Sequence, residues 1–192
     1  MADLGSYLAK HAEPAVAGII LALAGAASAI AAEIRMPATS LDEAAGAVNA
    51  DGDTQKKLDV IADDIVLEAL AGTGVASYLS EERDAAVPVD PEGAMIVACD
   101  PLDGSSNIGV NVSVGTIFSL LPALGGELQS GRSQLAAGFF VYGPQTTLLL
   151  TVGNGTASFR MDGDGGFRLL EERVTIPPVS YTHLTLPTTS CG

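Results

Sequence analysis

Eight consecutive residues combine the side chains that a metal site and a phosphate site need. The segment Asp100–Asn107 reads DPLDGSSN and directly follows an apolar run. Its two aspartates stand three residues apart across a proline turn, so both carboxylates can converge on one hard cation such as Mg²⁺, which prefers oxygen ligands. Gly104 lets a ligand approach the backbone, and Ser105, Ser106 and Asn107 supply hydrogen-bond donors for a phosphate. An ordinary Asx turn with serine caps fits the same residue types equally well.

Two further acidic pairs lie where a strand or a loop is expected to end. Glu81 and Glu82 follow an apolar run, and adjacent like charges repel each other unless water or a cation is present. Asp53 and Asp59 flank two lysines where a loop leads into an expected helix. A solvated loop explains the glutamates, and helix capping explains Asp53. Three acidic groups together favour a site for several metal ions more strongly than any one of them alone.

Charge and composition exclude several classes of partner. The 192 residues include 9 Lys and Arg against 23 Asp and Glu, a net charge of −14. This balance argues against nucleic acid and against an anionic membrane, because both would be repelled. The two cysteines, Cys99 and Cys191, provide neither a disulfide framework nor a zinc site. We therefore expect a reduced, cytoplasmic setting for a protein that binds cations.

The first long apolar segment is expected to be a helix. Ala15–Ala32 is an uncharged run of 18 residues, at the short end of the length that spans a membrane. It consists mostly of Ala and Gly, its larger apolar residues recur at helical spacing, and no positively charged signal-peptide region precedes it. We interpret it as a packed core helix of a soluble protein, ended by Pro37.

A second helix and a series of strands must position the acidic groups. An amphipathic pattern predicts a helix over 56–70. Short apolar runs predict strands over 75–80, 94–99, 110–121, 136–142, 146–152, 157–161 and 167–170. Gly-containing turns between the last four strands predict two hairpins. Helices followed by mostly antiparallel strands are typical of an α+β fold.

The end of the chain differs from the rest. Residues 1–178 are expected to form one domain, whereas residues 179–192 continue no helical or strand period. This tail contains His183 and Cys191. We interpret it as a non-native extension, so neither residue is a catalytic candidate.

Four sequence blocks occur in an order and spacing that point to a known family. They are Asp53–Val60 (DTQKKLDV), Leu79–Glu82 (LSEE), Asp100–Asn107 (DPLDGSSN) and Val114–Phe118 (VGTIF). Together they resemble the amino-terminal half of class I fructose-1,6-bisphosphatase. The DPLDG motif alone is shared with inositol and nucleotide phosphatases, but the blocks QKKLD and GSSN favour the sugar bisphosphatase. The resemblance implies a layered α/β sandwich whose second domain is missing here.

The resemblance also implies a role for each candidate residue. The metal ligands, which would hold two or three Mg²⁺ ions or Mn²⁺ in their place, are Glu81, Asp100, Asp103 and the carbonyl of Leu102. The residues that orient and deprotonate the attacking water are Asp53 and Glu82, with Asp59 as a supporting carboxylate. The residues that bind the 1-phosphate are Asp103, Gly104, Ser105, Ser106 and Asn107.

The implied activity is hydrolysis of the 1-phosphate of fructose 1,6-bisphosphate by a homotetrameric phosphoric monoester hydrolase. The family's carboxy-terminal domain carries a further metal ligand and the residues that hold the sugar and its 6-phosphate. We therefore expect this chain to be truncated and inactive alone. Two alternatives stay open. One is another phosphatase of the superfamily, acting on sedoheptulose bisphosphate or on inositol or nucleotide phosphates. The other is a non-catalytic metal-binding fragment.

Overall fold

The computed structural model of the protein describes residues 2–35 and 52–176. Within them, three α-helices precede the strands: α1 (Leu4–His11), α2 (Pro14–Ile34) and α4 (Gly52–Leu70). The sequence predicts the last two of them, and it predicts that helices come before strands. The strands are β1 (Val75–Ser80), β2 (Val87–Pro88), β3 (Met95–Asp103), β4 (Val114–Pro122), β5 (Ala136–Tyr142), β6 (Thr146–Thr151), β7 (Thr156–Met161) and β8 (Phe167–Glu171). The expected helix end at Pro37 and the expected tail at 179–192 lie outside the described residues.

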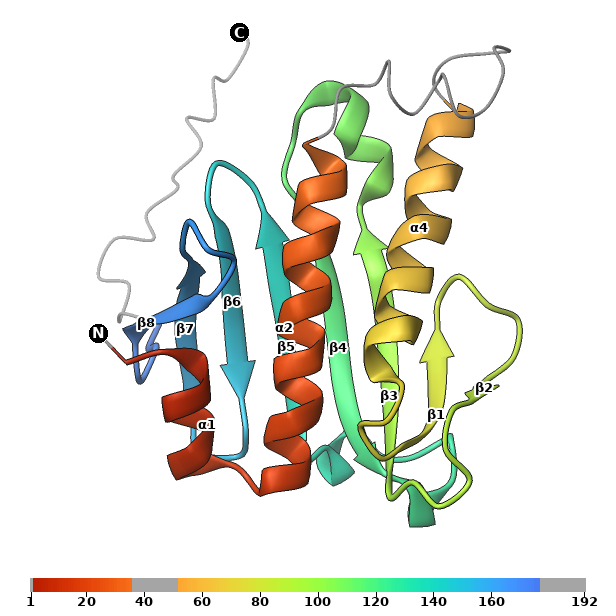
Figure 1. The fold of residues 1–192 in the computed structure, drawn as a ribbon, viewed down its shortest axis with the longest axis vertical. Coiled ribbons are helices and arrows are strands. Elements are labelled where there is room, and N and C mark those ends of the chain that lie inside the picture. The colour runs from red at the N-terminus through yellow and green to blue at the C-terminus, as the bar shows by residue number, and fades with distance from the viewer. Residues whose placement is uncertain (1, 36–51, 177–192) are drawn as a thin grey trace, which may run out of the picture.

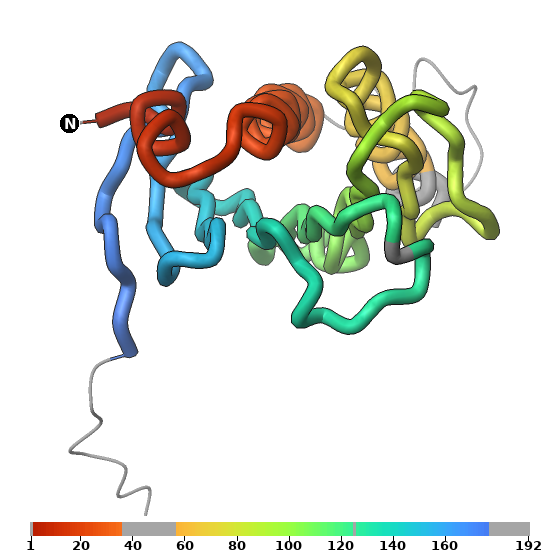
Figure 2. Tube along the Cα trace, turned by 90° about the horizontal axis from the view of Figure 1, so that it is seen from below, coloured from red at the N-terminus to blue at the C-terminus, as the bar shows by residue number. Residues whose placement is uncertain are grey.

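All eight strands join one sheet in the order β2-β1-β3-β4-β5-β6-β7-β8. Among the strands of residues 2–35 and 52–176, only β1 and β3 pair in parallel, and every other neighbouring pair is antiparallel. The prediction of an α+β fold with a mostly antiparallel sheet is thereby confirmed. The three helices lie on one face of the sheet and form a single layer, which Figures 1 and 2 show from two directions.

Helix α2 lies across the middle of the sheet. Pro14 occupies its first turn, where the missing N–H of proline costs no hydrogen bond. Ile19, Ile20 and Leu23 are almost completely buried. Among the described residues, α2 is the one helix long and apolar enough to cross a membrane, but length and composition alone also fit a core helix. Its packing against the sheet supports the core-helix interpretation.

The short helix α1 was not predicted, because its eight residues are too few for a clear period. Its cap is local: the Asp3 side chain accepts a hydrogen bond from the Ser6 N–H at 2.7 Å. Its tertiary partners come from the far end of the sheet. Leu169 N–H donates to the carbonyl of Ala2 at 2.9 Å, and Tyr7 meets Phe159 edge-on with ring centroids 5.2 Å apart. The first and last described elements therefore pack together (Figure 1).

Two predicted strand bounds were wrong, and both lie next to the motif of interest. The strand expected over 94–99 continues to Asp103, because Asp103 still pairs with Gly115 after a register shift. The strand expected from residue 110 begins only at Val114. Residues Ser105–Val110 instead form a 3₁₀ helix, η1, which ends at Asn111 in the left-handed conformation.

The second face of the sheet is covered by none of the three described α-helices (Figure 2). Ile117 is 46% exposed and Phe139 is 41% exposed. Both line an apolar groove of about 460 Å³ that extends to Asp100. Large apolar side chains in a continuous exposed groove are typical of a surface that another part of a protein covers.

Candidate functional site

The parallel pairing of β1 and β3 places two acidic segments at the same edge of the sheet. Parallel strands end at a common edge, and Ser80 stands opposite Cys99 in the register. One residue further, the Glu81 N–H donates to the Cys99 carbonyl at 3.0 Å. Glu81 and Glu82 therefore lie beside Asp100, as a shared site requires.

Two hydrogen bonds fix the end of β3, which contains the two aspartates. The Asp100 side chain accepts a hydrogen bond from the Leu102 N–H at 3.2 Å. This is the Asx turn that the sequence offers as an alternative to a metal site. The Thr116 hydroxyl donates to the carbonyl of Pro101 at 2.7 Å. Leu102 is buried and Asp103 is exposed. The turn and a metal-binding role are thus compatible, because the turn fixes where the Asp100 carboxylate lies.

The predicted phosphate-binding residues occupy the turn into η1. Gly104 has φ +77°, a conformation that side chains with a Cβ rarely adopt. Its carbonyl accepts the Asn107 N–H at 2.8 Å, and a Cβ added at Gly104 would lie 3.2 Å from the Asn107 side-chain nitrogen. Ser106 is exposed. The Ser105 hydroxyl instead donates to Asp59 at 3.2 Å.

Asp59 projects from α4 into this cluster. One carboxylate oxygen accepts the Ser105 hydroxyl, and the other, Oδ1, is buried and has no hydrogen-bond partner among the described residues. Burial raises the pKa of Asp59, the Ser105 hydrogen bond opposes this, and the charge of Glu81 raises the pKa further. A buried carboxylate oxygen without a partner is costly unless a cation or a water molecule satisfies it.

The neighbouring carboxylates repel one another. Partial desolvation raises the pKa of Glu82, although the residue as a whole is exposed, and the charges of Asp59, Glu81 and Asp100 raise it further. Burial likewise raises the pKa of Asp100; the Leu102 hydrogen bond opposes this, and the charge of Asp103 adds to the rise. Each group thus disfavours the ionised form of the others, which a divalent cation would reverse.

The donor set fits a hard divalent cation. Carboxylates from α4, from the turn after β1 and from the end of β3 are near enough to raise one another's pKa, and one of their oxygens is the unpartnered Oδ1 of Asp59. Across 2–35 and 52–176, no three His, Cys, Asp or Glu side chains already stand in a metal-binding arrangement. Asp53 lies in the first turn of α4, and its side chain is not among those the structure describes. The ligand roles therefore stay predictions.

Sequence reasoning missed several polar residues that brace this cluster. Asp63 and Thr116 are almost fully buried, and Tyr78 and Arg83 both contact Asp63. One signal was available for Asp63: it follows Asp59 by four residues, so the two share a face of α4. Thr116 gave no signal, because its polar partners Pro101 and Tyr142 lie 15 and 26 residues away in the sequence, on the neighbouring strands β3 and β5.

Known proteins similar in sequence to this chain belong to one family. The family description "Fructose-1-6-bisphosphatase, N-terminal domain" matches residues 5–172. The class 1 fructose-1,6-bisphosphatase of Paracoccus denitrificans is 46% identical over 172 residues, which cover 87% of this chain and 50% of that protein. That of Neisseria meningitidis serogroup A is 43% identical over 190 residues, covering 92% of this chain and 59% of that protein.

A solved structure shares the fold. The fructose-1,6-bisphosphatase of Leishmania major in its holo form superimposes with a TM-score of 0.79 at 29% identity, covering 92% of this chain and 56% of that one. The single sheet with its helix layer is thus the fold of a sugar-phosphatase domain. The chain belongs to the fructose-1,6-bisphosphatase family and corresponds to its N-terminal domain. It spans about half the length of the curated relatives it matches.

Proposed function

We propose that this chain is the metal-binding half of a Mg²⁺-dependent fructose-1,6-bisphosphatase, which converts fructose 1,6-bisphosphate to fructose 6-phosphate. The observation that carries the proposal is the carboxylate cluster at the β1/β3 edge, with the buried Oδ1 of Asp59 left without a partner. Membership of the family supplies the substrate class.

Four groups of this chain would hold the metal: the side chains of Glu81, Asp100 and Asp103, and the Leu102 carbonyl. Two or three bound Mg²⁺ ions, for which Mn²⁺ can substitute, would offset phosphate charge and lower the pKa of water. The protein's own groups determine where that water and the phosphate lie.

Glu82 suits the task of accepting a proton from the attacking water. Desolvation is the largest cause that raises its pKa, and this contribution does not depend on the neighbouring charges that a bound cation would offset. A base works best when its pKa approaches the working pH. Asp53 would share this task, and Asp59 would support both. The turn from Gly104 to Asn107 would bind the 1-phosphate through backbone N–H groups and hydroxyls. In this arrangement the Ser105 hydroxyl would move from Asp59 to the phosphate.

The face of the sheet that no described α-helix covers supports the proposal that a second half of the enzyme packs there. The apolar groove reaches Asp100, so a second half that covers it would lie directly beside the carboxylates. We propose that this second half contributes the residues that hold the sugar and the 6-phosphate, and that the complete enzyme is a homotetramer in the cytoplasm. The buried, free Cys99 agrees with a reducing setting.

The test is an assay of inorganic phosphate release from fructose 1,6-bisphosphate with Mg²⁺. The purified chain is assayed alone and with a separately expressed carboxy-terminal half from the Paracoccus relative. No release from the chain alone and release of the 1-phosphate after mixing would support the proposal. If the chain binds Mg²⁺ but no phosphate is released, either from the chain alone or after mixing, a non-catalytic metal-binding fragment is favoured. Faster release from sedoheptulose bisphosphate, inositol phosphate or a nucleotide would favour another phosphatase of the superfamily.

A further inference from the structure

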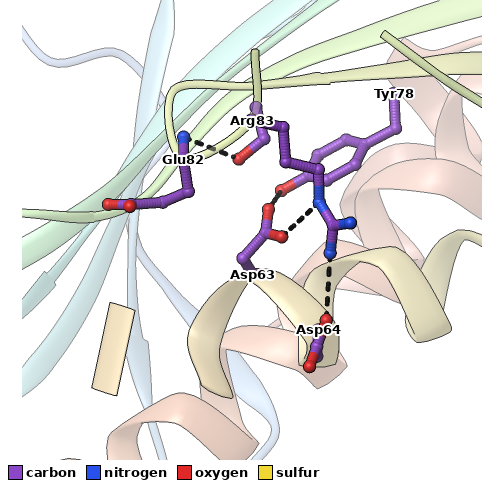
Figure 3. Close-up of polar contacts among 6 residues, drawn as sticks. Asp63, Asp64, Tyr78, Glu82 and Arg83 are labelled. Carbon is purple, nitrogen blue, oxygen red and sulfur yellow. Dashed lines mark hydrogen bonds and ion pairs between the residues drawn. The ribbon is translucent and has the colours of Figure 1, made fainter. Parts of the chain in front are cut away.

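The turn that carries Glu81 and Glu82 is fastened to α4 by the next residue, Arg83. Within the turn, the Arg83 N–H donates to the Ser80 carbonyl at 3.3 Å, and the Glu82 N–H donates to the Ser80 hydroxyl at 3.2 Å. From this turn the Arg83 side chain reaches α4. Figure 3 shows its guanidinium above the helix, whereas the Glu82 carboxylate points to the other side.

Arg83 makes two contacts of very different character. Its Nε donates to Asp63 at 2.5 Å, and its Nη2 donates to Asp64 at 2.9 Å. The Asp64 side chain is 66% exposed, so this contact is a surface ion pair of small effect. The Asp63 side chain is 4% exposed, and a buried carboxylate requires partners for its charge.

Each oxygen of Asp63 has one partner. Oδ2 accepts from Arg83, and Oδ1 accepts from the Tyr78 hydroxyl at 2.9 Å. Tyr78 is completely buried on β1, and burial raises its pKa, so the phenol stays a donor. The strand and the turn that follows it are therefore anchored at one point on α4 (Figure 3).

That point is one helical turn from the candidate site. Asp59 and Asp63 are four residues apart and face the same side of α4. Asp59 accepts a hydrogen bond from Ser105, in the predicted phosphate-binding turn. Asp63 binds Arg83, in the turn that carries Glu81 and Glu82. The helix thus sets the distance between the two loops that must act together.

We propose that Arg83 is a positioning residue, which holds Glu81 and Glu82 against α4 so that their carboxylates meet those of Asp59 and Asp100. This inference rests on the proposed metal site. Arg83 touches neither substrate nor metal in this role. Its guanidinium fixes the turn and neutralises Asp63, whose charge otherwise adds to the repulsion at Glu82.

Two measurements on the intact chain test the proposal. The first is hydrogen exchange at the Glu82 and Arg83 amides, and the second is Mn²⁺ affinity by electron paramagnetic resonance. The main variant is the double substitution Asp63→Asn/Arg83→Met, which removes the ion pair, leaves no buried charge unpaired and keeps an acceptor for the Tyr78 hydroxyl. Arg83→Lys keeps the charge and tests rescue, and Asp64→Asn removes only the exposed pair.

The double variant should exchange these two amides faster and bind Mn²⁺ about tenfold more weakly, the lower end of the effect of losing an outer-shell partner of a metal ligand. Arg83→Lys should recover part of both, and Asp64→Asn should match the wild type. Unchanged exchange overturns the proposal, and so does faster exchange with unchanged Mn²⁺ affinity. If the wild-type chain binds no Mn²⁺, the proposed metal site fails, and exchange alone then decides whether Arg83 holds the turn.

Discussion

Replacing Thr116 by valine should destabilise the protein far more than the loss of one surface hydroxyl would. Valine keeps the shape of the side chain and removes only its hydrogen-bonding group. In the structure, the Thr116 hydroxyl donates to the Pro101 carbonyl at 2.7 Å and lies 2.6 Å from the Tyr142 hydroxyl. A hydroxyl has one proton, so Tyr142 must be the donor in the second contact. Thr116 and Tyr142 are both buried, at 2% and 6% exposure.

The expected magnitude follows from counting the groups left without a partner. Thr116→Val takes a partner from both the Pro101 carbonyl and the Tyr142 hydroxyl, and each buried unsatisfied group costs about 1–3 kcal/mol. The free energy of unfolding should therefore fall by about 2–6 kcal/mol. Tyr142→Phe leaves the bond to Pro101 in place, so it should cost only about 0.5–1.5 kcal/mol.

The double variant provides the stringent check. Once Thr116 is valine, changing Tyr142 to phenylalanine removes a hydroxyl that has no partner, so stability should recover by about 1–3 kcal/mol. The assay is urea unfolding at 25 °C followed by far-ultraviolet circular dichroism, with the denaturant slope checked for constancy. A loss below about 1 kcal/mol in Thr116→Val, or a double variant less stable than the single one, would refute this reasoning.

Three further predictions concern the site and the open face. Millimolar Mg²⁺ or Mn²⁺ should raise the melting temperature because it relieves carboxylate repulsion. Asp103→Asn should reduce that rise, and identical melting curves with and without metal would contradict the site. In the reconstituted enzyme, Glu82→Gln should lower kcat by about 10²–10⁴-fold with little change in KM, whereas Cys99→Ser should leave kcat nearly intact; full turnover in Glu82→Gln would remove its role as the base. Phe139→Ser should reduce self-association of the chain in sedimentation velocity, because it removes apolar surface from the open face; equal association would mean that this face is not responsible.

Much of the sheet could be predicted from the sequence because its signals are local. The bounds of β1 and β5 match the predicted ranges, and those of β6, β7 and β8 agree to within one residue. Each of these strands is a short run rich in apolar or β-branched residues with a glycine-containing turn on at least one side. The acidic segments of the candidate site were also found locally, since their residue types stand out within a few positions.

The features that remained hidden depend on contacts between distant residues. Periodicity does not reveal that β1 pairs in parallel with β3, yet this pairing is what brings Glu81 to Asp100. The 3₁₀ helix after Gly104 follows from backbone dihedrals that composition does not determine. The bond between Asp63 and Arg83 spans 20 residues, and neither residue type alone indicates that the carboxylate is buried.

The packing of α1 against the last strands has a consequence for how the chain is made on the ribosome. Ala2 and Leu169, which hydrogen-bond to each other, are 167 positions apart. At about 5–20 residues per second, roughly 10–30 s pass between their synthesis. During that time α1 can pack against α2, but its side chains that meet β7 and β8, such as Tyr7, lack those native partners. A nascent chain in this state can dock its first helix onto the completed β7–β8 hairpin of a neighbour on the same messenger, which would yield an exchanged dimer. Synthesis on crowded polysomes should therefore favour such dimers over refolding from dilute denaturant.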